Sequence, residues 1–327
     1  MVRQAKTERP ISELGTLDRS SGGSVGLSQP STKSEPPETT YRALSLGAGV
    51  QSSVLALLLS RQDTRLAALG YAKPDCAIFA DTGWEPGYVY KHLDWLETQL
   101  EYPVIRVSVG NIEKNLQNAV TVTGHQFVDV PFYLVNPDGT KGSVRRQCTT
   151  HYKITPIQAR IRFEAGGKPR RLFPKDKHVE IWLGISSDEI LRMKPSREHW
   201  ITHRWPLIDL GWSRYDCQQW FSGEYPGRHL PRSACVICPY RSNQNWLEMK
   251  RHDPKSFDEA VNFDNQLRGR TTTPIRQTLR GRPYLHNTRR PLATVIAEFE
   301  RAADVLDGRT AEHYNPFNNE CEGMCGV

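Results

Sequence analysis

The stretch at residues 41–60 constrains the fold of this chain more than any other. It reads YRALSLGAGVQSSVLALLLS: an apolar run, a short segment of small and polar residues, and a second apolar run from residue 54. This order predicts a strand, a tight loop and a helix. The small and polar positions of the loop are Gly47, Ala48, Gly49, Gln51, Ser52 and Ser53.

The predicted loop has the chemistry of an anion site. Glycines allow a sharp turn and close approach of a ligand to the backbone. Ser52 and Ser53 stand where a helix opens, with free N–H groups and the positive end of the helix dipole. A phosphate or a sulfate suits such a place. The alternative is an ordinary turn between strand and helix, because glycine-rich turns after strands are common.

Further strands are predicted at residues 76–80, 104–109 and 179–184, with a helix at 88–100. Strands that alternate with helices predict an α/β fold with a doubly wound, mostly parallel sheet and flanking helices, in which ligands bind beyond the carboxyl ends of the strands. Asp81, Thr82 and Gly83 follow one of these strands. We therefore expect them to share a site with the glycine loop, although Asp81 can also serve only as a helix cap.

Composition sets the outer bounds of the chain. With 327 residues, of which 38% are hydrophobic and 24% charged, it is long enough for one large core with an appendage. Residues 1–39 are rich in Ser, Thr, Gly, Pro and charge, which predicts a disordered tail. No apolar run reaches the roughly 18 residues of a membrane span, and no signal-peptide pattern begins the chain. We expect a cytoplasmic protein without a membrane partner.

Seven cysteines in a chain of this length do not indicate a secreted disulfide scaffold, so their spacing is considered for metal or redox chemistry. Cys235 and Cys238 form a CxxC pair followed by proline, and Cys148 stands alone. A redox dithiol, a structural zinc site and an iron–sulfur cluster bound by all three are each compatible with this pattern. Cys76, in an apolar strand, and Cys217, in a predicted helix, are expected to pack in the core.

The ordered set of these segments resembles the phosphoadenosine phosphosulfate (PAPS) reductase family of the PP-loop, or adenine nucleotide alpha-hydrolase-like, superfamily. It comprises residues 44–54 and 81–83, Cys148 and Thr149 with Lys153 and Pro156, and residues 184–192, 206–209 and 235–238. The resemblance implies a nucleotide-binding domain at 40–250, with ATP or PAPS as the nucleotide. The implied binding residues are Ser45, Gly47, Ala48, Gly49, Gln51, Ser52, Ser53, Asp81, Thr82, Gly83, Lys153, Gly184 and Arg192.

The sequence departs from the family pattern at two places. Iron–sulfur members carry a Cys-Cys pair plus CxxC, whereas only Cys148 stands at the first site here. The resemblance thus implies a 4Fe–4S cluster with three protein ligands and a fourth iron that is open, bound by substrate, or bound by another cysteine. Reductases of the family end in Glu-Cys-Gly with a nucleophilic cysteine, whereas an extra Glu322 follows Cys321 here. Cys321 and Cys325 are both candidate catalytic residues, and a fourth cluster ligand or a regulatory disulfide are alternatives.

The C-terminal region, residues 251–327, is predicted to be helical and basic, and it ends in a cysteine-containing tail. Residues 268–290, from Arg268 to Arg290, carry seven arginines and no acid. With the net charge of +7, this stretch predicts either a phosphate-binding surface, for nucleic acid or nucleotide, or a solvated loop.

Three functions follow from these observations. The first is sulfonucleotide reduction or sulfur transfer, with a thiol reductant protein as partner. The second is ATP-dependent, iron–sulfur-dependent sulfur modification of nucleic acid. The third is a non-catalytic nucleotide-binding module.

Overall fold

The computed structural model describes residues 39–120, 124, 129–168, 170–269 and 274–305. These residues belong to one unit that begins at Pro37. The predicted disordered tail, apart from Thr39, lies outside the described residues, and so do the candidate catalytic residues Cys321 and Cys325.

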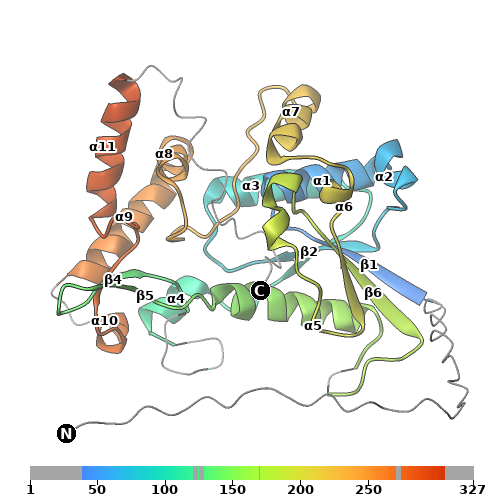
Figure 1. Ribbon diagram of the computed structural model, residues 1–327, viewed down its shortest axis with the longest axis horizontal. Helices are drawn as coiled ribbons and strands as arrows, with labels where there is room; N and C mark the ends of the chain where they lie inside the picture. The colour runs from blue at the N-terminus through green and yellow to red at the C-terminus, as the bar shows by residue number, and fades with distance from the viewer. Residues whose placement is uncertain (1–38, 121–123, 125–128, 169, 270–273, 306–327) are drawn as a thin grey trace, which may run out of the picture. The chain divides into compact units, whose positions relative to one another are not determined.

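A five-stranded parallel sheet forms the centre of the described structure (Figure 1) and confirms the predicted α/β fold class. The strand order is β3-β2-β1-β6-β7, with all four neighbouring pairs parallel. The strands are β1 Thr39–Ser45, β2 Cys76–Ala80, β3 Val104–Val107, β6 Lys177–Leu183 and β7 Ile201–Arg204. β7 was not predicted, because its four residues contain one buried apolar side chain, that of Ile201, and so show no strand pattern.

Helices cover both faces of this sheet because alternate residues of each strand point to opposite sides. Leu44 of β1 packs in the core cluster of α1, α3 and α7, while its neighbour Ala43 packs in the cluster that contains α5. Figure 1 shows α5 on the other side of the strands from α1. The helices are α1 Val50–Ser60, α3 Gly87–Glu97, α5 Thr155–Glu164 and α7 Arg214–Glu224.

The helix α1 is buried on every side, from Val50 to Ser60. A helix in such a position must be apolar all round, which accounts for the run of valine, alanine and leucine at residues 54–59. The polar residues Gln51, Ser52 and Ser53 are also fully buried in its first turn. Buried polar groups need hydrogen-bond partners, so we expect the partners of these three side chains around the first turn of α1.

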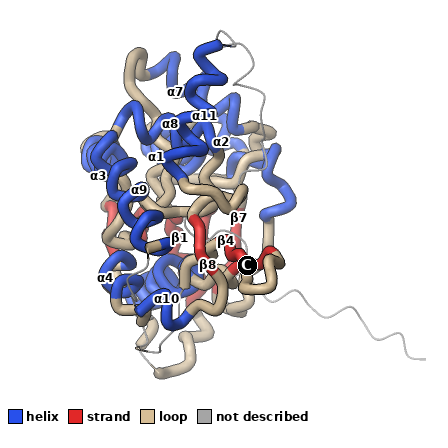
Figure 2. The backbone as a smooth tube through the Cα atoms, turned by 90° about the vertical axis from the view of Figure 1, so that its left-hand side faces the viewer, coloured by secondary structure: helices blue, strands red, loops and turns tan. Residues whose placement is uncertain are grey.

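A small antiparallel sheet and five helices form a second layer with its own core. The sheet has the order β5-β4-β8, and its core contains Phe132, Trp246, Phe263 and Leu292. Figure 2 shows α4 beside α10 in this layer. The elements are β4 Tyr133–Val135, β5 Lys141–Ser143, β8 Arg282–Tyr284, α4 Ile112–Gln117, α8 Asn243–His252, α9 Pro254–Arg268, α10 Pro274–Thr278 and α11 Leu292–Val305.

The apolar spacing of residues 246–267 predicts a helical segment, and the structure confirms the helical conformation but divides the segment into two helices. The chain forms α8 and α9, which are separated at Asp253. Pro254 has no N–H to continue the first helix but suits the first position of the next. The Asp253 side chain accepts the backbone N–H of Ser256 at 3.1 Å and caps α9.

Other local predictions are confirmed. The sequence predicts a helix near residues 213–221 with Ser213 as its N-cap, and Ser213 does cap α7, by accepting the backbone N–H of Asp216 at 3.2 Å. Cys76 and Cys217 are buried in the core. The remaining helices are α2 Thr64–Ala68, α6 Pro206–Asp209, the π-helix η1 Thr150–Ile154 and the 3-10 helix η2 Ser187–Arg192. Among the described residues, none of the helices has the length and apolar character needed to span a bilayer.

Candidate functional site

The candidate site lies at the carboxyl ends of β1, β2 and β6. Strands β2 and β3 lie on one side of β1, and β6 and β7 lie on the other. The strand order therefore reverses between β1 and β6, where open α/β sheets bind their ligands. Ser45 ends β1 opposite Leu183 of β6, so the loop at residues 46–49 and the segment after Gly184 start side by side.

Ser52 holds the glycine loop in shape. Its Oγ accepts the backbone N–H groups of Gly47 at 3.2 Å and of Gly49 at 3.3 Å. Ala48, between them, has a φ of 57°, a left-handed conformation that is uncommon for a residue with a Cβ. Local strain of this kind concentrates at functional sites. An anion that binds these N–H groups would compete with Ser52 for them.

Gly184 serves close packing at the same edge. A Cβ built on it would lie 2.8 Å from both the backbone N and the Cα of Ser52. No real side chain fits at that distance from backbone atoms, so only glycine lets β6 approach the loop. The structure thus gives Gly184 a steric role; its predicted contact with a nucleotide stays a prediction.

Gln51 and Arg192 meet through Glu189. The Gln51 amide donates to Glu189 Oε2 at 3.1 Å and to Ser186 Oγ at 3.3 Å. Arg192 makes a 2.5 Å ion pair with the same Glu189 oxygen. Gln51 Oε1 is buried without a hydrogen-bond partner, and such orphaned acceptors are costly. A ligand that donates a hydrogen bond there would satisfy it.

Asp81 closes the turn after β2. Its Oδ1 accepts the Tyr90 hydroxyl at 2.7 Å and the Gly83 N–H at 2.8 Å. The alternative that Asp81 is a helix cap is wrong, because Pro86 precedes α3 at that position. Gly83 has a φ of +75° and packs against Asn111, so its conformation also requires glycine.

The three predicted cluster ligands line one cavity of about 30 Å³. Cys148 approaches from the start of η1, and Cys235 and Cys238 come from the CxxC turn, which is closed by the Cys238 N–H donating to the Cys235 carbonyl at 3.0 Å. Val236 and Ile237, between the two cysteines, are buried in the second core. Burial of these two apolar residues fixes the turn. Thr82 and Lys153 line the same cavity.

A buried polar cluster surrounds Cys235. Thr82 Oγ1 lies 3.3 Å from Cys235 Sγ and donates to Glu85 Oε1 at 3.2 Å. That oxygen also lies 3.4 Å from Lys153 Nζ and 3.5 Å from Cys235 Sγ. The pKa of the Cys235 thiol is raised well above its usual range, mainly by burial and next by the negative charge of Glu85. Cys235 therefore remains a neutral thiol unless a cation binds it.

The three cysteines supply the type of ligand that an iron–sulfur cluster uses, but the cavity in its present shape is too small for one. No group of three His, Cys, Asp or Glu side chains within the described ranges is arranged to hold one metal ion. Three thiols on one cavity are nevertheless the ligands that iron–sulfur clusters use, each on a separate iron. A cavity of about 30 Å³ holds little more than one water. A cluster would thus require the three side chains to move apart.

The buried His92 lies beside Ser53, in the first turn of α1. Its Nε2 is 3.0 Å from Ser53 Oγ. The pKa of His92 is lowered from 6.5 to about 3. Burial is the main cause, and the nearby positive charges of Arg228 and His229 contribute less. At pH values between about 3 and 6.5, His92 is protonated in the unfolded chain but not in the native state. The free energy of unfolding therefore falls as the pH falls through this range.

We expect this loss to reach about 1.4 kcal/mol per pH unit below the unfolded-state pKa. Urea unfolding at a series of pH values measures it, with His92→Gln as the comparison because glutamine does not titrate. The variant should show a shallower pH dependence than the native protein. An identical slope in both proteins would contradict the assignment.

The arginine-rich stretch at residues 268–290 is built partly into the fold. Arg268 pairs with Asp264 at 3.0 Å, and Arg289 donates to the carbonyls of Leu134 at 3.0 Å and Gly142 at 3.1 Å. The Arg268 pair lies within α9, and the Arg289 bonds join the segment after β8 to the hairpin of β4 and β5. The alternative of a plain solvated loop is wrong for α10 and β8, and the predicted phosphate-binding surface stays a prediction.

Comparison with solved structures finds similarity to the crystal structure of phosphoadenylyl-sulfate (PAPS) reductase from Candida auris in a phosphate complex. The two chains are 14% identical, with a TM-score of 0.34, and the match covers 60% of this chain and 75% of that chain. No family model matches the sequence. The curated proteins contain no match either.

Two buried acids at the site were not predicted as site residues. Glu85 contacts both Thr82 and Lys153. Glu189 contacts both Gln51 and Arg192. Each of the two acids lies within four residues of a predicted site residue. Glu189 precedes Arg192 by three residues, a spacing at which opposite charges pair on a helix. That spacing was the available signal for Glu189.

Proposed function

We propose that this protein binds an adenine nucleotide at the carboxyl edge of the sheet, between β1 and β6, and carries out sulfur chemistry at the adjoining cysteines. One observation carries the proposal. Thr82, which follows β2 at the nucleotide edge, lies 3.3 Å from the sulfur of Cys235. A ligand on that edge would therefore lie next to the cysteine cavity.

The loop would bind the phosphate or sulfate of the nucleotide. Its N–H groups on Gly47 and Gly49, now bonded to Ser52 Oγ, would turn to the anion, which the N-terminus of α1 also favours. Arg192, oriented by Glu189, would supply a positive charge. Gln51 Oε1 would accept a hydrogen bond from the nucleotide.

Cys148, Cys235 and Cys238 would hold a 4Fe–4S cluster. When bound, it would supply an iron position open to a sulfur ligand. Lys153, buried beside Glu85, would place a positive charge next to the thiolates that the cluster requires. Thr82 would connect the cluster cavity to the nucleotide edge.

Sulfonucleotide reduction is the reaction we favour. The thiolate of Cys321 or Cys325 would attack the sulfur of PAPS and expel the nucleotide, which leaves an S-sulfonated cysteine. A thiol reductant protein would then attack the cysteine sulfur, release sulfite and leave a disulfide that a second thiol resolves. ATP-cleaving members of the PP-loop superfamily carry a Ser-Gly-Gly-x-Asp-Ser loop, whereas this chain has Gln51 in place of the acidic residue, which supports this choice.

ATP-dependent sulfur modification of nucleic acid is the second candidate. It is favoured by the number of cysteines on the cavity, which is three among the described residues, because a cluster with three protein ligands leaves an iron open. The net charge of +7 also favours a polyanionic partner. In this reaction ATP, not PAPS, would be consumed.

Incubation of anaerobically purified protein with each nucleotide tests the proposal. Sulfite release from PAPS in the presence of a dithiol supports reduction, and ATP cleavage that depends on RNA or DNA supports the second candidate. Cys321→Ser and Cys325→Ser, made separately, identify the nucleophile: its loss should stop sulfite release but leave nucleotide affinity and iron content intact. Unchanged nucleotide under every condition would contradict both reactions.

A further inference from the structure

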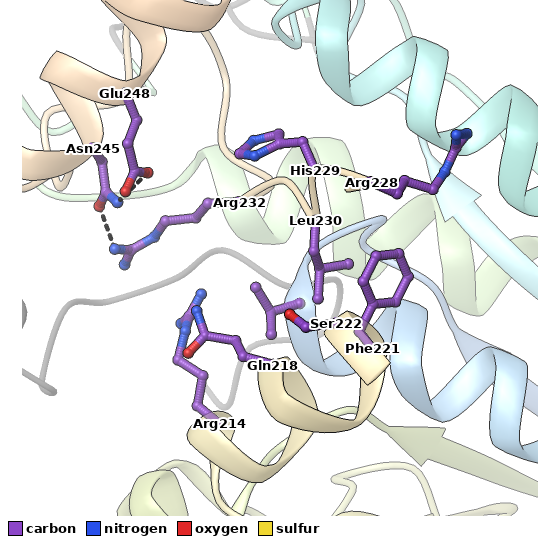
Figure 3. Close-up of a pocket in the computed structure, with 11 residues that line it drawn as sticks. Arg214, Gln218, Phe221, Ser222, Arg228, His229, Leu230, Arg232, Asn245 and Glu248 are labelled. Carbon is purple, nitrogen blue, oxygen red and sulfur yellow. Dashed lines mark hydrogen bonds between the residues drawn. The ribbon is translucent and has the colours of Figure 1, made fainter. Parts of the chain in front are cut away.

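Positive side chains have two kinds of environment in this fold. Around the cavity of about 390 Å³ beside α7 and α8, shown in Figure 3, guanidinium groups are used within the protein. Arg232 donates to Asn245 Oδ1, and Arg228 lies over the ring of Trp95, with 3.7 Å from its Cζ to the ring centroid. Such contacts hold the fold together. The loop between α5 and β6 differs, because its cations face solvent.

Arg162, in the last turn of α5, holds this loop against the helix. Its Nε donates to the Lys168 carbonyl at 3.5 Å, and its NH2 group donates to the Arg171 carbonyl. The same guanidinium lies 5.5 Å from the ring centroids of both Phe173 and Trp200, which stack on each other. One arginine thus fixes the backbone of the loop through two carbonyls.

Four cations of the loop have no partner among the residues that the structure describes. Each is exposed, and none of their side chains forms an ion pair or a hydrogen bond with a described residue. The two acids of residues 160–177 offset little of this charge, because Glu164 is already paired with Arg160 at 2.5 Å and only Asp176 remains. The loop therefore concentrates positive charge on one surface. The four cations are Lys168, Arg170, Arg171 and Lys175.

Two apolar side chains are exposed beside these cations. Phe163, at the end of α5, is 64% exposed, and Leu172 is 90% exposed. The four cations together with Phe163 and Leu172 are called the basic loop surface. An exposed ring near unpaired cations suits single-stranded nucleic acid, because cations contact phosphates and a ring stacks on a base. A lipid surface suits an amphipathic helix, and the described residues between α5 and β6 are not helical.

We propose that the basic loop surface binds a single strand of nucleic acid, with the four cations on its phosphates and Phe163 against a base. The surface lies next to Lys177, where β6 begins, whereas the candidate site lies beyond Leu183, where β6 ends. A strand of this length spans about 20 Å. The surface thus anchors nucleic acid away from the cysteine cavity. This inference goes beyond the proposed function and does not rest on it.

Fluorescence anisotropy of a labelled oligonucleotide of about 20 nucleotides, titrated with the full-length protein at several salt concentrations, tests the proposal. Oligothymidylate and oligouridylate distinguish DNA from RNA. Joint replacement of the four cations should weaken binding at least about tenfold and reduce the slope of log affinity against log salt by about 3, since each phosphate contact contributes about 0.7 on a single strand. The substitutions are Lys168→Gln, Arg170→Gln, Arg171→Gln and Lys175→Gln.

A control variant removes the same net charge from exposed cations outside the loop, which also make no side-chain bond to a described residue. Its affinity should change by less than about threefold, because distant charges are screened by salt. The control substitutions are Lys91→Gln, Lys114→Gln, Arg251→Gln and Lys255→Gln.

The stacking role of Phe163 has its own test. Phe163→Ala should weaken oligonucleotide binding by roughly fivefold or more, as for a lost stack on a base. Tyr215→Ala is the matched control, because Tyr215 of α7 is an aromatic residue with 65% exposure, and it should leave the affinity unchanged. Equal effects of the two substitutions would contradict the contact with a base.

Two further results would overturn the proposal: equal weakening by the loop variant and the control variant, or no binding of either oligonucleotide by the native protein. Binding to phosphatidylserine vesicles that requires the four cations, without oligonucleotide binding, would assign the surface to a membrane instead. ATP and PAPS titrations keep the two proposals apart. If neither nucleotide binds but the loop variant alone loses the oligonucleotide, the proposed function fails and the basic loop surface stands.

Discussion

Replacing Gly184 by alanine should abolish most nucleotide binding and destabilise the protein by roughly 1–3 kcal/mol, the usual cost of overpacking a filled space. The new Cβ would lie 2.8 Å from the backbone N and Cα of Ser52. Ser52 cannot move freely, because its Oγ accepts the N–H groups of Gly47 and Gly49. The clash would therefore be transmitted to the anion loop, and we expect nucleotide affinity to fall at least about tenfold.

Gly223→Ala is the matched control for this substitution. Gly223 lies inside α7, and a Cβ built there meets nothing within 4 Å. Alanine at an exposed helix position should add up to about 1 kcal/mol of stability, with nucleotide affinity unchanged. Urea unfolding and calorimetry of both variants make the comparison. Native affinity in a folded Gly184→Ala protein would contradict the placement of the nucleotide at this loop.

Replacing Cys235 by serine should remove the iron and the broad visible absorbance of an anaerobically purified protein. The sulfur of Cys235 lies 3.3 Å from Thr82 Oγ1 and 3.5 Å from Glu85 Oε1. Serine oxygen is a poor substitute for a soft thiolate ligand of iron. The same loss is expected of Cys148→Ser and Cys238→Ser, because all three line one cavity.

Cys217→Ala controls for the loss of any thiol. Cys217 is buried in the core between α1 and α7, so alanine there should cost some stability and leave the iron content unchanged. Iron and acid-labile sulfide per chain, with the visible spectrum, provide the measurement. Stoichiometric zinc without iron in the native protein, or full iron in Cys235→Ser, would exclude the cluster.

Much of the fold could be predicted because its signals are local. The run at residues 76–80 has the same bounds as β2, and Ser213 is the cap of α7 that its position before the helix indicates. The prediction of helical structure over residues 246–267 is also local, although it does not place the break that Pro254 causes between α8 and α9. β4, β5 and β8 are three residues long each, and strands this short are determined by their partners and not by their own sequence.

The candidate site could be predicted in outline only. Parallel strands bring their carboxyl ends to one edge, so the proximity of Gly47 and Asp81 follows from the pattern. The contact of Thr82 with Cys235 joins residues 153 apart in sequence, and only tertiary packing determines it.

Calorimetric titration of the native, full-length protein with ATP and with PAPS tests the central claim most directly. The account predicts saturable binding of at least one of the two nucleotides, with one bound per chain. Binding should survive Gly223→Ala and be lost in Gly184→Ala. The absence of saturable binding of either nucleotide to folded native protein would contradict the account.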